Sequence, residues 1–272
     1  MKSYLTLISS DNYLQGALVL NESLKRSHAK YKLTVLISAN VSSKVENILN
    51  KMQIDVIRIN KTVTIDSKLE KHNEEVGYKH WNNTFDCLLS FGLCQFDKLV
   101  FLDSDMLVLE NIDELFDKPH MSAVKDPGTT TLNSGTVVIE PEEGLVEKLI
   151  EKIPAIMENH YYFGDQTVLQ EYYKDWPDKP ELHLDDKYNM FLGSLHWFIG
   201  VEGYHLNGKS KNIGVVHFVG GIKPWMIKTA DLAGLYKTYT EQGNPYAIQM
   251  TNLYLEILEE QLAIINKLGL YV

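Results

Sequence analysis

Short apolar runs alternate with helical patterns at the start of this chain, and this alternation constrains the fold more than any other feature. Residues 4–9, 33–38 and 55–59 have the composition of β-strands, and the second run is continuously apolar, as strands buried on both faces are. Between these runs, apolar residues recur at helical spacing from Leu14 to Leu24, and again after Ser42, a candidate N-cap. A strand-helix-strand-helix-strand order predicts an α/β fold built on a parallel, doubly wound sheet.

The rest of the chain predicts further strands and helices around one long polar segment. Residues 60–80 show no clear period, which favours a functional or mobile loop. The patterns that follow indicate a helix over residues 83–95, a buried strand at 98–102, a short helix at 112–117, strands near 121–125, 135–140 and 214–218, and helices near 143–159 and 164–174. From Pro245 to Leu268 the apolar spacing is that of an amphipathic helix, which we expect to pack on the domain. The alternative for this helix is a membrane contact or a homodimer contact.

Composition and charge narrow the class of protein. A chain of 272 residues with 44% hydrophobic residues can build one large α/β domain with a small appendage. The net charge of -10 argues against a nucleic-acid partner, whereas a divalent cation can bridge an acidic protein to an anionic nucleotide. No apolar run reaches about 18 residues and the first residues lack a signal-peptide pattern, so we expect a cytoplasmic protein without an integral membrane segment.

The two cysteines, Cys87 and Cys94, fall on the helix predicted over residues 83–95. Their spacing places them about two turns, or roughly 10 Å, apart, which is too far for a disulfide. We expect two ordinary buried thiols in a reducing compartment.

A pair of aspartates follows the strand at residues 98–102. In an extended chain, Asp103 and Asp105 point to one side and Ser104 points to the other. Ligands in open α/β sheets bind beyond the carboxyl ends of the strands, and hard oxygen donors suit Mg²⁺ or Mn²⁺. Because both aspartates lie between apolar runs, their charges need a partner. His217, after an apolar strand, is a candidate third ligand that favours Mn²⁺. The alternatives are that the pair starts an ordinary turn and that His217 is a hydrogen-bonded core residue.

The aspartate segment, residues 101–109 followed by 111–116, resembles the metal-binding segment of the glycogenin-like glycosyltransferases, family 8 of the retaining enzymes. Other segments resemble further family motifs in the same order, at residues 7–24, 123–128, 133–135, 164–166 and 217–225. The resemblance runs from about residue 4 to 225. It implies a GT-A fold, with a single Rossmann-like nucleotide-binding domain and a mixed sheet over residues 1–225, and a C-terminal helical extension over residues 226–272.

The resemblance also implies roles for individual residues. Asp103, Asp105 and His217 would bind Mn²⁺, with Mg²⁺ as the other candidate, and the ion would bridge the diphosphate of a UDP-sugar. The catalytic group would be Asp126, Asp165 and Gln166. The donor-binding group would be Leu7, Ser9, Asn12, Tyr13, Ser104, Asn133, Ser134, Gly220 and Lys223. Within it, Tyr13 would stack on the base and Lys223 would add a point charge to the phosphates.

Together these residues predict a retaining hexosyltransferase that moves glucose or galactose from a UDP-sugar to a carbohydrate, polyol or other hydroxyl acceptor. Its transition state would resemble an oxocarbenium ion, with front-side attack assisted by the departing diphosphate. The alternative is a catalytically weak or inactive UDP-sugar-binding protein of the same fold. A dehalogenase-type phosphatase is disfavoured because its aspartate motif lies near the chain start. A sugar nucleotidyltransferase is disfavoured because residues 7–12 are not a glycine-rich basic loop.

Some residues depart from the family pattern. Cys87 stands where the family carries a Lys or Arg contacting the donor, so we predict that Cys87→Lys raises turnover or lowers the donor KM. Residues 190–203 after Tyr188-Asn189 contain no tyrosine, which argues against self-glucosylation of the glycogenin kind. Tyr162 replaces an acidic residue and suits stacking on a sugar ring. Other candidate aromatic platforms are Trp81, Trp197 and Trp225.

Overall fold

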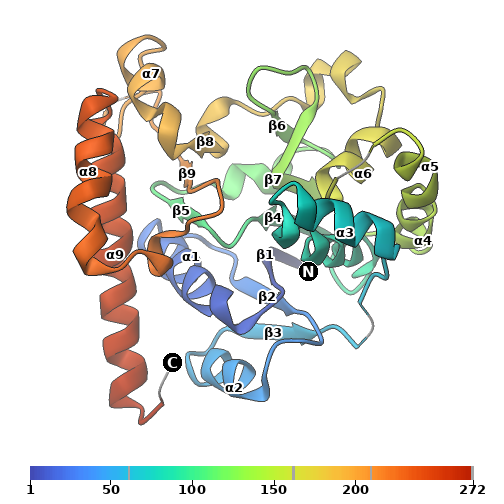
Figure 1. Cartoon of the computed structure of the whole chain (residues 1–272), viewed down its shortest axis with the longest axis horizontal. Helices are drawn as coiled ribbons and strands as arrows, with labels where there is room; N and C mark the ends of the chain where they lie inside the picture. The colour runs from blue at the N-terminus through green and yellow to red at the C-terminus, as the bar shows by residue number, and fades with distance from the viewer. Residues whose placement is uncertain (61, 161–162, 209, 271–272) are drawn as a thin grey trace.

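The computed structural model describes residues 1–60, 62–160, 163–208 and 210–270, without the side chain of His80. In this part of the chain, a six-stranded sheet separates two layers of helices (Figure 1). The strand order is β3 (Asp55–Arg58), β2 (Leu33–Ile37), β1 (Lys2–Ile8), β4 (Lys98–Leu102), β7 (Leu132–Ile139) and β6 (Ala123–Lys125). Strands β1 to β4 are parallel, and β7 runs antiparallel to both β4 and β6. The α/β fold with a mixed sheet is therefore confirmed.

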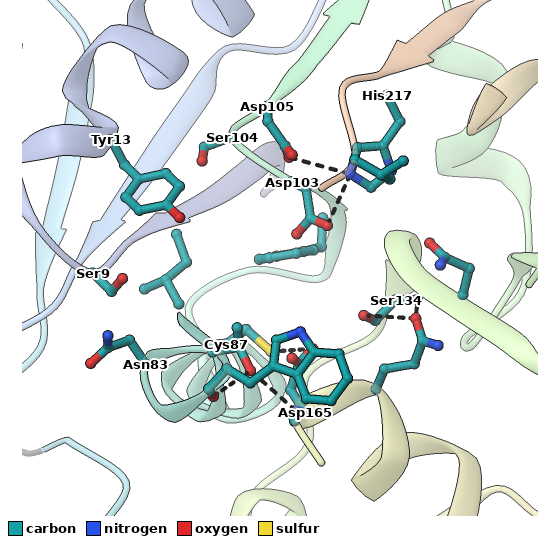
Figure 2. A pocket seen from close by; sticks show the side chains of 18 of the residues that line it. Ser9, Tyr13, Asn83, Cys87, Asp103, Ser104, Asp105, Ser134, Asp165 and His217 are labelled. Atoms are coloured by element: carbon teal, nitrogen blue, oxygen red, sulfur yellow. Dashed lines mark hydrogen bonds and ion pairs between the residues drawn. The ribbon is translucent and has the colours of Figure 1, made fainter. Parts of the chain in front are cut away.

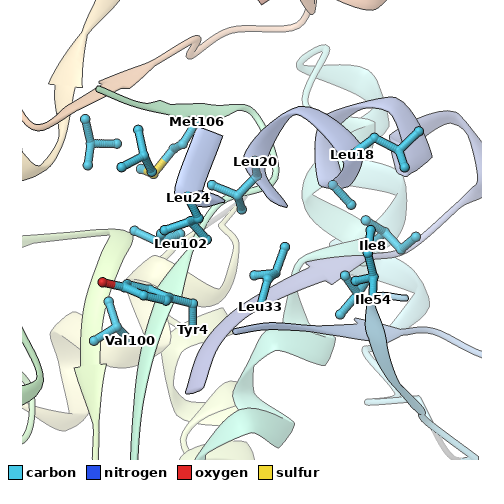
Figure 3. Close-up of a cluster of buried hydrophobic side chains, with 14 of the residues drawn as sticks. Tyr4, Ile8, Leu18, Leu20, Leu24, Leu33, Ile54, Val100, Leu102 and Met106 are labelled. Carbon is cyan, nitrogen blue, oxygen red and sulfur yellow. The ribbon is translucent and has the colours of Figure 1, made fainter. Parts of the chain in front are cut away.

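Helices α1 (Leu14–Arg26) and α2 (Ser43–Lys51) cover one face of the sheet. The predicted N-cap of α2 forms, since the Ser42 hydroxyl accepts a hydrogen bond from the Val45 amide at 3.3 Å. The apolar face of α1 packs on the strands through buried residues such as Leu18, Leu20 and Leu24 (Figure 3). This packing holds the carboxyl ends of β1 and β4 side by side, where the aspartate pair emerges.

The other face of the sheet is covered by α3 (Ser67–Glu75), α4 (Leu145–Ile150), α5 (Ile153–Met157), α6 (Asp165–Tyr172) and 3₁₀ segments at Lys79–Asn83 and Phe85–Gly92. Several predictions were wrong here. The polar stretch at residues 60–80 contains α3, whose N-cap Asp66 accepts from the Lys68 amide at 2.7 Å. The helix predicted over residues 83–95 is 3₁₀ and ends at Gly92, so Cys94 lies beyond it and is exposed, whereas Cys87 is buried as expected.

A small second sheet, which the sequence patterns did not predict, has the order β5 (Met106–Val108), β9 (Val215–His217) and β8 (Met190–Phe191). Strand β5 begins directly after the aspartate pair. Antiparallel pairing of β5 with β9 sets Met106 opposite His217, and parallel pairing of β8 with β9 sets Phe191 beside the same histidine. This sheet therefore brings His217 to the aspartates from more than a hundred residues away in sequence.

The C-terminal part contains α7 (Leu195–Gly200), α8 (Leu232–Glu241) and α9 (Pro245–Lys267), with α8 lying along α9 (Figure 1). The buried face of α9, including Met250, Tyr254 and Ile257, packs against α1 and the small sheet, as its amphipathic pattern predicted. Short 3₁₀ turns connect the elements at Asp11–Tyr13, Asp113–Asp117, Trp176–Asp178, Pro180–Leu182, Asp186–Tyr188, Leu192–Ser194, Pro224–Met226 and Thr229–Asp231. Among the described residues, no helix is both long and apolar enough to cross a membrane.

Candidate active site

A cleft of about 510 Å³ opens at the carboxyl ends of β1 and β4, where the main sheet meets the small sheet. It gathers almost all of the predicted site residues: Leu7, Ser9, Tyr13, Asp103, Ser104, Asp105, Asp126, Asn133, Ser134, Asp165, Gln166, His217, Gly220 and Lys223. The exception is Asn12, which lines a separate hollow of about 450 Å³ beside Trp225. Residues to which the sequence analysis gave no role also line the cleft: Asn83, Thr84, Phe101, Thr167, Phe191 and Val219.

Asp103, Asp105 and His217 form a tight cluster in the cleft (Figure 2), and their candidate ligand atoms all lie within 4.8 Å of one another. Nε2 of His217 is 3.5 Å from an oxygen of Asp103 and 3.3 Å from an oxygen of Asp105. The backbone is anchored at both aspartates, because the Asp103 amide donates to the Gly135 carbonyl and the Asp105 carbonyl accepts from the Phe218 amide. Two carboxylates and one imidazole nitrogen at this spacing fit a divalent cation such as Mn²⁺.

One detail of the aspartate motif differs from the prediction. The chain does not stay extended after β4 but turns at Ser104 and Asp105. Ser104 consequently lines the cleft as well, instead of facing away from it. In Figure 2 its hydroxyl lies on the side of the cleft where Tyr13 and Ser9 stand, beyond the Asp105 side chain.

The two aspartates differ in their electrostatic surroundings. Burial, with the Asp105 and Asp165 carboxylates nearby, raises the pKa of Asp103 above the usual carboxyl range. Burial acts in the same direction on Asp105, but His217 and an ion pair with Lys223 together hold the pKa of Asp105 well below its usual range. Of the two carboxyls, Asp103 is therefore the weaker acid.

A second group of cleft residues surrounds Asp165, the first residue of α6. The Cys87 thiol donates a hydrogen bond to the Asp165 carboxylate at 3.1 Å, and the Thr84 hydroxyl accepts from the Asp165 amide at 3.3 Å (Figure 2). Burial raises the pKa of both Asp165 and Cys87. Beside them, the Gln166 side chain accepts a hydrogen bond from the Ser134 amide at 3.0 Å.

Asn189 is a site residue whose contacts the sequence did not predict. Its carbonyl oxygen meets Nδ1 of His217 at 2.8 Å, and its amide nitrogen donates to the Asn133 side chain at 2.6 Å. Asn133 in turn donates to Asp126 at 2.8 Å. No local spacing marks Asn189, because the pairing of β8 with β9 is what brings it to His217.

The candidate aromatic platforms lie in different surroundings. Trp81 lines the cleft and stacks on Tyr78 with ring centroids 4.1 Å apart. Trp225 packs edge-on against Tyr13, with centroids 5.7 Å apart, and Trp197 lies on α7 with 46% of its surface exposed. Tyr162 lies outside the described residues.

Comparisons with known proteins point in one direction. The model of the family described as glycosyl transferase family 8 matches residues 4–229. Human glycogenin-2 is 34% identical over 259 residues, which are 94% of this chain and 49% of glycogenin-2. The UDP-glucuronate:xylan alpha-glucuronosyltransferase 1 of Arabidopsis thaliana is 30% identical over 233 residues, or 83% of this chain and 32% of that protein. The chain thus spans half or less of the length of these relatives.

The fold has solved counterparts. The crystal structure of the glycosyltransferase GlyE from Streptococcus pneumoniae TIGR4 superposes with a TM-score of 0.57 at 18% identity, covering 96% of this chain and 63% of GlyE. At that identity the likeness concerns the fold alone. The shared fold is GT-A, as the mixed sheet and the C-terminal helices indicate.

Proposed function

Since the chain belongs to glycosyltransferase family 8, we propose that it is a retaining hexosyltransferase that moves a hexose from a UDP-sugar to a hydroxyl of a saccharide or other acceptor. We further propose that the reaction depends on Mn²⁺. The observation that carries this proposal is the convergence of Asp103, Asp105 and His217 in the cleft that also holds Lys223 and Asp165.

Three groups would hold the diphosphate end of the donor. Asp103, Asp105 and His217 would hold the cation, which supplies Lewis-acid stabilisation of the departing diphosphate. Lys223 would add its charge to the same phosphate oxygens. Gly220 has a φ of 108°, a conformation that side chains rarely tolerate, and its bare backbone leaves room for a phosphate to approach.

Tyr13, Ser9 and Leu7 would hold the nucleoside end of the donor. All three line the cleft, and Tyr13 and Ser9 lie on the far side of the aspartate turn from Ser134 (Figure 2). The Tyr13 ring is braced by Trp225, and a braced aromatic ring is a suitable surface for a uracil base.

The sugar end of the cleft, defined here as Asp126, Asn133, Asp165 and Gln166, favours a neutral hexose. Among the described residues that line the cleft, the basic side chains are His217 and Lys223, and Lys223 is already paired with Asp105. A sugar carboxylate placed beside Asp126 and Asp165 would meet like charges, because the proposed cation and Lys223 are assigned to the diphosphate. We therefore propose UDP-glucose or UDP-galactose as the donor rather than UDP-glucuronate, although one relative is named for the latter.

A thermal-shift panel tests the proposal. UDP and Mn²⁺ together should raise the melting temperature well beyond either alone, because a ligand at about 100 times its Kd adds about 2.7 kcal/mol of stability. UDP-glucose or UDP-galactose should act like UDP, and GDP and UDP-glucuronate should act more weakly. Absence of any shift with UDP and Mn²⁺ would refute the proposal.

A second measurement separates a transferase from a binding protein of the same fold. A transferase should hydrolyse its UDP-sugar slowly when no acceptor is present, in a reaction that requires Mn²⁺. Stabilisation by UDP without any hydrolysis would favour the non-catalytic alternative. An Asp103→Asn variant is the matched control, since it should lose both the Mn²⁺ effect and the hydrolysis.

A further inference from the structure

We infer that Asn189 and Asn133 are positioning residues that keep the proton of His217 on Nδ1 and so leave the lone pair of Nε2 for the metal. They form a chain of hydrogen bonds that starts at Asp126 and ends at His217, with each side chain oriented by its neighbour. The inference rests on the proposed metal-dependent function. It adds that residues other than the three metal ligands help to set the affinity of the metal site.

The orientation of Asn133 is fixed by two independent partners. The Gly135 backbone amide, which can only donate, lies 2.9 Å from Oδ1 of Asn133. The Asp126 carboxylate, which accepts when ionised, lies 2.8 Å from Nδ2 of Asn133. Both contacts require the same assignment of the amide, with its oxygen turned towards Gly135 and its nitrogen towards Asp126.

The orientation of Asn189 follows from that of Asn133. Because the Asn133 oxygen faces Asn189 at 2.6 Å, the atom it meets must be a donor, which is Nδ2 of Asn189. The remaining atom of the amide, Oδ1, then faces Nδ1 of His217 at 2.8 Å and can only accept. Nδ1 of His217 must therefore carry a proton.

Burial makes this assignment exclusive. Asn189 is 4% exposed, His217 is 5% exposed and Asn133 is 8% exposed, so water has little access to replace any of these partners. Reversing one amide would set two donors or two acceptors against each other in a buried place, at a cost of about 1–3 kcal/mol for each unsatisfied group.

The consequence lies on the other side of the imidazole ring. When Nδ1 holds the proton of a neutral histidine, Nε2 has a lone pair, and that atom faces the oxygens of Asp103 and Asp105 at 3.5 and 3.3 Å. A lone pair and two carboxylates directed at one place are complementary to a cation. Outer partners of metal-bound histidines commonly act in this way, and their loss lowers metal affinity by about 10–100-fold.

The fold is shaped to admit this arrangement. A Cβ atom on Gly135 would lie 2.8 Å from Cε1 of His217 and 3.0 Å from the Asn133 oxygen. A glycine at this place in β7 therefore lets the histidine ring and the asparagine approach each other. Asn189 directly precedes β8, and the pairing of β8 with β9 keeps it close to His217.

A pair of substitutions at one position tests the inference by Mn²⁺ affinity, measured without donor by calorimetry or by the electron paramagnetic resonance of free Mn²⁺. Asn189→Leu keeps the size of the side chain but removes the acceptor, and should weaken Mn²⁺ binding by about 10–100-fold. Asn189→Asp keeps the acceptor for Nδ1–H but loses the donor to Asn133, so it should bind Mn²⁺ about as tightly as the unaltered protein. Asn50→Asp, at an exposed position on α2, is the control for the charge change.

This pair separates positioning from a structural role. Both variants disturb the same buried place and should lower the melting temperature, but only Asn189→Leu should lose metal affinity. Equal Mn²⁺ affinity for the Leu variant and the unaltered protein would overturn the inference. Equal loss in both variants would also overturn it, because the position would then act through the fold alone.

A direct measurement on the unaltered protein does not depend on any variant folding. Nitrogen-15 shifts of the His217 ring, recorded on the metal-free protein with the ring neutral, should show a protonated Nδ1 and an unprotonated Nε2. A proton on Nε2 would overturn the inference. If the protein bound no divalent cation, the proposed function would fail together with the inference. If it bound Mn²⁺ with the predicted pattern but not UDP, the proposed function alone would fail.

Discussion

The Cys87 thiol occupies a place in the cleft where a cation would be expected beside a buried carboxylate. It donates to Asp165 at 3.1 Å, and burial raises the pKa of Asp165. The hydrogen bond from this neutral donor acts to lower the pKa of Asp165, but burial outweighs it.

Replacing this thiol with an amine tests how much the missing charge matters. Cys87→Lys should pair with Asp165, lower the pKa of that carboxyl, and raise turnover or lower the donor KM by up to roughly tenfold, or about 1.4 kcal/mol. Cys87→Ser, which keeps a donor but adds no charge, is the matched control and should change neither quantity in that direction. The measurement is steady-state hydrolysis or transfer with UDP-glucose, and unchanged kinetics in the Lys variant would remove this residue from donor binding.

Asp103 links the metal site to stability. A carboxyl whose pKa is raised in the folded state holds its proton there while the unfolded chain has already released it, so stability falls as pH rises through that window. Asp103→Asn should therefore raise the melting temperature of the metal-free protein near pH 8, and much less near pH 4. The effect should be on the order of 2 °C, because the side chain keeps 39% of its surface exposed to solvent.

Melting curves with and without Mn²⁺ at both pH values check this prediction. The unaltered protein should recover at pH 8 when Mn²⁺ is added, and the Asn variant should not respond. If the Asn variant were less stable than the unaltered protein near pH 8 without metal, the ionised Asp103 carboxylate would not be destabilising as predicted.

Residue patterns in the sequence located most of the cleft because family motifs lie at strand ends, and strand ends of one sheet meet in space. Asn12 was predicted to bind the donor but lies outside the cleft. Residues 11–13 form a 3₁₀ turn, which leaves Tyr13 in the cleft and places Asn12 in another hollow. The contacts of Asn189 were not predicted, because its partners come from β7 and β9 and no periodicity in its own segment indicates these long-range contacts.

At the scale of elements, the sequence predicted the strands and helices that have a strong apolar period. It failed where tertiary contacts decide the backbone. Phe85–Gly92 has helical apolar spacing but forms a 3₁₀ segment. In it, the Asp86 carboxylate accepts hydrogen bonds from the Ser38 hydroxyl at 2.5 Å and from the Val63 amide at 2.8 Å. Helix α3 was missed because its sequence is almost entirely polar, with Leu69 as its buried apolar residue.

Helix α1 controls the aspartate turn through one small residue. A Cβ atom on Gly16 would lie 2.4 Å from the Ser104 carbonyl oxygen and 2.9 Å from the Trp225 ring. A backbone carbonyl cannot move aside unless the whole turn moves, and this turn carries Asp103 and Asp105.

Gly16→Ala should therefore lower the affinity for Mn²⁺ and for UDP roughly tenfold, while the overpacking costs about 1–3 kcal/mol of stability. Gly234→Ala on α8 is the matched control, because a Cβ atom there meets nothing within 4 Å and helix propensity should favour the alanine by about 0.8–1 kcal/mol. Calorimetric titration and chemical denaturation of both variants give the two quantities. Unchanged Mn²⁺ affinity in Gly16→Ala would show that the turn does not depend on this contact.

At the scale of the whole molecule, the cleft depends on a hydrophobic core that the C-terminal helix completes. Leu107 of β5 and Val216 of β9 lie opposite each other in the small sheet and are buried together with α9 residues. In that core Tyr254 packs edge-on against Phe218 at 4.9 Å between ring centroids and stacks on Trp225 at 6.0 Å. The helix therefore supports the strand that carries His217 and the ring that braces Tyr13.

Tyr254 offers a final test of whether α9 is part of the catalytic domain or an extension beyond the boundary proposed near residue 225. Its side chain is fully buried, and its hydroxyl has no hydrogen-bond partner among the described residues. Tyr254→Phe should therefore leave stability unchanged or raise it by about 1 kcal/mol, since it removes a buried polar group that lacks a partner. Tyr254→Ala should cost about 3–5 kcal/mol through the cavity it leaves, and should weaken Mn²⁺ and UDP binding because Phe218 and Trp225 lose their support. Urea denaturation should show one cooperative transition for both variants, with the Ala transition shifted to lower urea. A separate early transition in Tyr254→Ala, with ligand affinity intact, would instead favour α9 as an independent extension.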